Sequence, residues 1–134
     1  MEKKTDAIFQ SFLEKAERRL QERKTRKTET LYIPSLDSEI KVRALSMAEI
    51  TECSEVEDKT DSNASDKYCV YLAIVEPDIR KAAMALSDQG VIKSYPEIVE
   101  LFTPSEITEI ATEVMKLSGV ISSKKVRVVE TLKN

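Results

Sequence analysis

The chain has 134 residues, a formal net charge of −3 and a charged fraction of 34%. This length corresponds to one ordinary domain, which buries enough surface to need neither disulfides nor a structural metal. Histidine is absent and only two glycines occur, Gly90 and Gly119. The commonest general base is therefore missing, and glycine-rich nucleotide-binding motifs are excluded. We predict no catalytic residue, metal ligand or cofactor, and we do not expect an enzyme or a small-molecule substrate.

Cysteine content and hydropathy indicate a protein of the cytoplasm. Cys53 and Cys69 lack the C-x-x-C spacing of a redox or zinc motif, and we expect both to be buried thiols in a reducing compartment. No apolar run approaches the roughly 20 residues that span a bilayer, so no membrane contact is expected. The start M-E-K-K-T-D also lacks the apolar region of a signal peptide.

Charge is divided unevenly along the chain. Residues 1–27 contain nine Lys or Arg and five Asp or Glu, and residues 122–134 contain four and one. The remaining eight basic and eighteen acidic residues leave residues 28–121 near −10. Basic ends and an acidic middle favour either an oppositely charged partner or packing of the ends on the chain's own middle.

The first predicted element is an amphipathic helix from Thr5 to about Arg26. Its apolar residues recur at helical spacing, namely Ile8, Phe9, Phe12, Leu13, Ala16 and Leu20. Four of them are candidate partner-binding residues: Ile8, Phe9, Phe12 and Leu13. Packing of this stripe on the chain's own domain is the favoured alternative. A charged linker follows, so we divide the chain into a basic N-terminal helix and linker (1–28), a central domain (29–119) and a basic C-terminal tail (120–134).

A small β-hairpin is predicted after the linker. Leu31 and Ile33 alternate with polar residues before a turn-rich segment at 34–39, and Ile40 and Val42 alternate after it. Two strands alone are marginal in water, so the shared apolar face must lie on helices.

The rest of the chain shows mainly helical patterns. We expect a short helix around 47–54, an acidic loop over 57–66 and a central helix from about Asp66 that ends before Pro77. Further helical segments are predicted at 77–86, 95–102 and 104–117. Gly90 and Gly119 should adopt left-handed conformations that end two of these regions. The tail over 124–133 has strand-like composition and is expected to be an edge strand or loose.

Three S/T-x-x-E sequences precede predicted helices. They pair Ser46 with Glu49, Ser94 with Glu97, and Thr103 with Glu106. In a capping box the hydroxyl accepts from the third helical N–H, and the glutamate accepts from the backbone N–H of the cap residue. We interpret all three pairs as helix caps rather than as catalytic carboxylate sites, which need an enclosing pocket.

The basic run from Arg18 to Lys27 raises a different function. It offers charge for nucleic acid phosphates but contains no aromatic residue for base stacking, and the chain is acidic overall. The alternative interpretation is a small nucleic-acid-associated or regulatory protein that uses its basic termini. Nucleic acid binding is less favoured than binding to a protein partner.

A series of short sequence segments between Leu31 and Gly119 resembles segments of a known protein family. They are R-A-L-S-M-A-E-I (43–50), A-I-V-E-P-D-I-R (73–80), D-Q-G-V (88–91), E-I-V-E-L-F-T-P-S-E-I (97–107) and M-K-L-S-G (115–119). In their amino-acid sequence and in their order along the chain, they resemble the XkdN-like tail assembly chaperones of phages and prophages. The N-terminal helix and the C-terminal tail lie outside the resemblance.

The resemblance implies a non-enzymatic helper of viral tail assembly. Members of that family bind the tape measure protein, an extended helical chain, and pass it to the tail tube protein. They act in the bacterial host cytoplasm and are absent from the mature virion, and a frameshift often yields a longer second product. For this chain we expect one α+β domain, mainly α, formed by a compact bundle of short helices with one small β-hairpin. Self-association into a homo-oligomer stays open.

Overall fold

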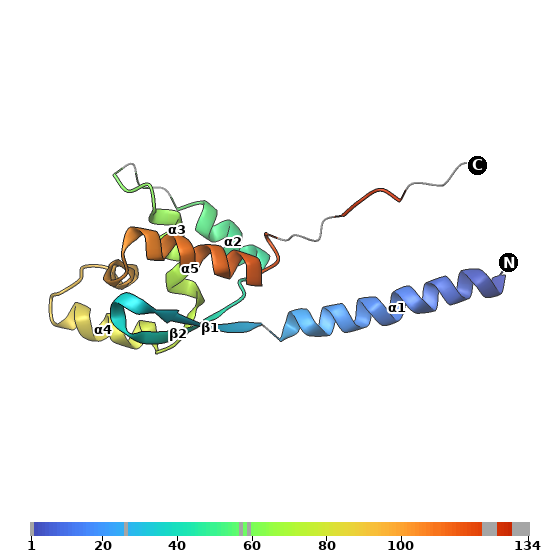
Figure 1. The fold of residues 1–134 in the computed structure, drawn as a ribbon, viewed down its shortest axis with the longest axis horizontal. Helices are drawn as coiled ribbons and strands as arrows, with labels where there is room; N and C mark the ends of the chain where they lie inside the picture. The colour runs from blue at the N-terminus through green and yellow to red at the C-terminus, as the bar shows by residue number, and fades with distance from the viewer. Residues whose placement is uncertain (1, 26, 57, 59, 122–125, 130–134) are drawn as a thin grey trace.

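The computed structural model describes residues 2–25, 27–56, 58, 60–121 and 126–129. Its elements are α1 (Glu2–Lys24), β1 (Thr28–Ile33), η1 (Pro34–Leu36), β2 (Ser38–Arg43), α2 (Met47–Ser54), α3 (Ala64–Ala73), β3 (Ile74–Glu76), α4 (Ile79–Asp88), η2 (Tyr95–Leu101) and α5 (Pro104–Leu117), where η marks a 3₁₀-helix. Figure 1 shows α1 extending to one side of a body formed by all the other elements. The predicted fold class, mainly helical α+β with a small antiparallel sheet, is confirmed.

The hairpin forms as predicted and presents one apolar face. β1 and β2 pair antiparallel with Leu31 opposite Ile40 and Ile33 opposite Ser38. Ile33, Ile40 and Val42 are buried on this face, whereas the outward face carries polar residues. α5 packs on both strands and α3 packs on α5, so helices cover the apolar face.

A third strand corrects the predicted extent of the central helix. α3 ends at Ala73, and Ile74–Glu76 pair antiparallel with β2, with Val42 opposite Ile74. The β-branched Ile74 fits a pleated, buried surface, and β2 supplies the hydrogen bonds that a further helical turn would have made. The next helix also begins later than predicted, because Asp78 caps it by accepting from the Lys81 N–H at 3.1 Å.

The core lies between α3, α5 and the sheet. Its most deeply buried large side chains are Val42, Cys53, Cys69, Val70, Val99, Ile107 and Val114. α3 contacts α2, α5 and η2, which agrees with its predicted central position. Both cysteines are free and buried, as predicted.

Two of the three predicted capping boxes are confirmed. Ser46 Oγ accepts from the Glu49 N–H at 3.2 Å while Glu49 Oε1 accepts from the Ser46 N–H at 2.9 Å. Thr103 and Glu106 make the same pair of bonds, at 3.2 and 2.8 Å.

The third predicted capping box, at Ser94 and Glu97, does not form, so this prediction is wrong. The segment that follows is a 3₁₀-helix in which the Glu97 N–H already bonds to the Ser94 carbonyl at 3.1 Å, so no free N–H remains for the hydroxyl. The Glu97 carboxylate accepts instead from the Lys93 N–H at 2.8 Å.

The predicted left-handed glycines are confirmed, and of the two options for the tail, an edge strand or a loose segment, residues 126–129 form no strand. Gly90 and Gly119 have φ values of 74° and 80°, in the left-handed region. Residues 126–129 have no regular secondary structure and are exposed. The rest of the strand-like segment, at 124–125 and 130–133, lies outside the described residues, as do positions 57 and 59 of the acidic loop.

The start of α5 has a side-chain cap and the start of η2 does not, so mutations at the two positions should change stability by different amounts. Thr103→Ala should lower the free energy of unfolding by about 1 kcal/mol, because it removes a hydroxyl that caps α5. Ser94→Ala is the matched control and should change it by less than about 0.5 kcal/mol, since its hydroxyl makes no cap bond. Urea denaturation measures both, and equal losses would contradict the assignment.

The environment of the Glu106 carboxylate predicts that the stability of the fold depends on pH. Hydrogen bonds from the Ser35 hydroxyl at 2.5 Å and from the Thr103 N–H hold its pKa below the usual 4.5. A folded-state pKa below the unfolded one means that stabilisation is complete above about pH 4.5 and is lost as pH falls through the folded pKa. The gap in stability between wild type and Glu106→Gln should therefore close on acidification, as measured by urea midpoints across pH.

Glu109→Gln is the control for this pH experiment. Glu109 lies on the same helix, and within the described residues its carboxylate makes no hydrogen bond or ion pair. A pH-independent gap for Glu106→Gln, or the same closing gap for Glu109→Gln, would contradict the role given to Glu106.

Candidate protein-binding surface

The candidate partner-binding residues form an exposed stripe on α1. Ile8, Phe9, Phe12, Leu13 and Leu20 are between 47% and 69% exposed, and we call them the apolar stripe. Spacings of three and four residues place them on one face of the helix, which extends roughly 18 Å from Ile8 to Leu20 at 1.5 Å per residue. The favoured expectation, that this stripe packs on the chain's own domain, is wrong. The body already covers its sheet with α5, and α1 projects away from it (Figure 1).

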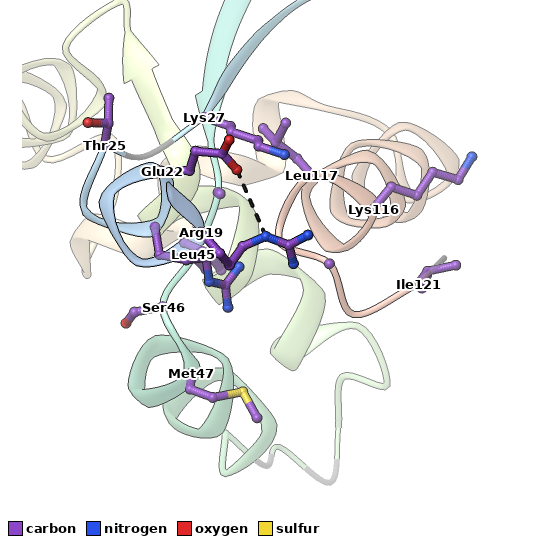
Figure 2. Close-up of a pocket in the computed structure, with 13 residues that line it drawn as sticks. Arg19, Glu22, Thr25, Lys27, Leu45, Ser46, Met47, Lys116, Leu117 and Ile121 are labelled. Carbon is purple, nitrogen blue, oxygen red and sulfur yellow. Dashed lines mark ion pairs between the residues drawn. The ribbon is translucent and has the colours of Figure 1, made fainter. Parts of the chain in front are cut away.

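A hollow lies at the base of α1, near the C-terminal end of the apolar stripe, and we call it the basal hollow. It has a volume of about 670 Å³ and lies between the end of α1, the connection from β2 to α2, and the end of α5. Figure 2 shows Arg19 and Glu22 from α1, Met47 from α2 and Lys116 from α5 around it. Residues from both ends of the sequence therefore form one concave surface.

The basal hollow is cationic. Its lining includes Arg19, Arg23, Lys27 and Lys116 against one acidic side chain, Glu22. The Arg19–Glu22 pair is 3.9 Å apart with both side chains more than half exposed, so it neutralises little charge. Within the described part of the chain, no ion pair engages Arg23 or Lys27. An acidic group would therefore be attracted to this hollow.

Hydrogen bonds fix the floor of the basal hollow. Leu45 N–H donates to Ser118 Oγ at 2.8 Å, and the buried Ser118 hydroxyl donates to the Val114 carbonyl at 2.7 Å. Beside it, the Arg43 guanidinium binds Glu49 through two bonds, at 3.0 and 2.6 Å. The connection from β2 to α2 is thus tied to the end of α5 on one side and to α2 on the other.

Sequence reasoning identified the apolar stripe but missed the basal hollow. Arg19 and Arg23 follow the stripe at helical spacing, and this signal is visible in the sequence. Lys116, in contrast, reaches the hollow only because α5 ends beside the β2–α2 connection. No local pattern links it to Lys27.

The two cysteines and Tyr68 have structural roles in the body. Burial raises the pKa of the Cys69 thiol to about 12 and also raises that of Cys53, so both disfavour the reactive thiolate. A hydrogen bond to Glu52 raises the pKa of Tyr68 to about 12. These groups hold α2 and α3 together.

The acidic segment before α3 is also tied to the body. The Lys67 ammonium lies 2.5 Å from Asp61 and 3.0 Å from Glu100, and these hydrogen bonds raise its pKa. The carboxylate of Asp61 correspondingly has a lowered pKa. Across the described residues, no group of three or more His, Cys, Asp or Glu side chains is placed to hold a metal ion.

Comparison with protein-family models, with curated proteins and with solved structures gave no match. Among the described helices, none has the length and apolar character that crossing a membrane requires.

Proposed function

We propose that this protein is a non-enzymatic phage or prophage tail assembly chaperone that binds the tape measure protein and promotes tail tube assembly. The observation that carries the proposal is the exposed apolar stripe of α1, a helix that the body leaves uncovered. The sequence segments between residues 31 and 119 that resemble the XkdN-like family are the reason for naming the tape measure protein and the tail tube protein as partners. The site of action is the bacterial host cytoplasm, before the virion is complete.

The apolar stripe and the basal hollow suit a long helical client. An amphipathic client helix would lay its apolar face on Phe9 and Phe12, which offer large side chains at low entropic cost. Acidic residues of the client would face Arg19 and Arg23 in the basal hollow. A contact surface limited to one helix is smaller than a standard permanent interface, which suits the transient binding that a chaperone requires.

Binding and stability should be separable in this protein. Phe12 is 69% exposed, so its replacement removes contact area for a partner and little from the core. Glu14 lies on the opposite side of the same helix. This arrangement provides a matched pair of variants in one helix.

The test is co-expression with the tape measure protein and the tail tube protein of the same gene cluster. We expect the wild-type chain to retain the tape measure protein in a pull-down, and Phe12→Ser to lower recovery about tenfold. Glu14→Ser should bind like wild type, and thermal melting should confirm that both variants fold. Failure of the wild type to associate with either partner would overturn the proposal, and equal losses in both variants would exclude the apolar stripe. The chain should also be encoded between the genes for these two partners.

A small nucleic-acid-associated or regulatory protein is the second candidate. The observation that favours it is the convergence of Arg19, Arg23, Lys27 and Lys116 on the basal hollow. It predicts a gel shift of DNA or RNA at low salt that weakens steeply with added salt and in Arg19→Gln/Arg23→Gln. The net charge of −10 over residues 28–121 opposes it, and the absence of any shift at low salt would remove this candidate.

A further inference from the structure

A second hollow lies at the end of the body away from α1, and we call it the distal hollow. It has a volume of about 490 Å³ and is lined by residues of the β1–β2 turn, β2, β3, the start of α4 and the end of η2. Figure 1 places the β1–β2 turn and α4 at the opposite end of the body from α1. β1 alone spans roughly 20 Å between α1 and that turn. In this structure the chain's own α1 extends away from the body on the opposite side and leaves this hollow open.

The distal hollow has an apolar floor and an apolar rim. Ile40, Ile74, Ile79 and Phe102 are buried beneath it, whereas Leu36 and Leu101 are 41% and 44% exposed at its edge. Exposed large side chains beside a concave apolar surface are typical of a site for another apolar group.

The hollow forms because the sheet is incomplete at this end. β3 pairs with β2 only at Lys41 and Val42, with an irregular register between them. Beyond Glu76 the chain passes through Pro77, which has no N–H to continue the ladder, and enters α4. The part of β2 before Lys41 is thus bordered by the hollow instead of by a third strand.

The rim of the distal hollow carries mainly acidic side chains, whereas α1 carries basic side chains beside the apolar stripe. Glu39 and Glu76 line it together with one cation, Lys41, and no ion pair within the described residues engages either glutamate. On α1, Lys15 and Arg19 follow Phe12 by three and seven residues, so they flank the apolar stripe on one side. The same complementarity holds overall, since residues 1–27 carry a net +4 and residues 28–121 about −10.

We propose that α1 of one copy docks in the distal hollow of a second copy. The apolar stripe covers the apolar floor and rim, and Lys15 and Arg19 approach Glu39 and Glu76. This inference goes beyond the proposed function, because it concerns the protein without any client. The two surfaces lie at opposite ends of one chain, so the contact is head-to-tail and repeats from copy to copy. A client that binds the apolar stripe competes with this contact.

The test measures the mass of the full-length chain by sedimentation and light scattering over a range of concentrations. We expect species larger than a monomer whose share rises with concentration. Phe12→Ser removes the donor surface and Leu101→Ser removes the acceptor surface, and each should weaken association at least about tenfold. Glu39→Lys, an exposed substitution on β2, is a second acceptor variant in case Leu101→Ser perturbs η2.

Mixing the variants provides the decisive observation. Phe12→Ser keeps an intact distal hollow and Leu101→Ser keeps an intact α1, so the mixture should form one-to-one dimers and nothing larger. Pairing between two α1 helices would instead leave Leu101→Ser and Glu39→Lys associating like wild type. That pattern, or a wild-type monomer at every concentration, would overturn the proposal. Because no tape measure protein is present, this outcome is independent of the client-binding test.

Discussion

The apolar face of the small sheet is the constraint on which the arrangement of this protein depends. Ile33, Ile40 and Val42 must leave water together, and two strands cannot bury them alone. α5 covers this face and α3 covers α5, which closes the core within residues 28–121. The outward face of the sheet is polar, and the apolar distal hollow lies at the end of the body away from α1. The exposure of the apolar stripe on α1 follows from this closed core.

Three polar contacts join the hairpin and the β2–α2 connection to the helices. Glu49 caps α2 and also binds Arg43 of β2, so one carboxylate fixes the direction in which the chain leaves the sheet. Ser118 ties the end of α5 to Leu45, and Glu106 ties the start of α5 to Ser35 in the hairpin turn. Both ends of α5 are thereby attached to segments that adjoin the sheet. The basal hollow lies beside the Ser118 contact, and the distal hollow lies at the end that carries the hairpin turn.

Elements governed by local interactions were predictable from the sequence, and those governed by pairing were not. α5 was predicted with its observed bounds because Thr103, Pro104 and Gly119 act within one helical turn of its ends. Ile74–Glu76 continued a helical pattern in the sequence, yet they form β3 because β2 is available beside them. Ser94 has the sequence of a cap, but the 3₁₀ geometry that follows uses the N–H that it would have bound.

The sequence by itself determined that α1 is amphipathic, since side-chain spacing along a helix depends only on its 3.6-residue turn. It also determined the basic and acidic division of the chain. Only the tertiary structure decided that the apolar stripe faces solvent, because this depends on where the uncovered apolar surface of the body lies relative to α1. The two hollows were likewise decided there, because residues as distant in sequence as Arg19 and Lys116 become neighbours only through packing.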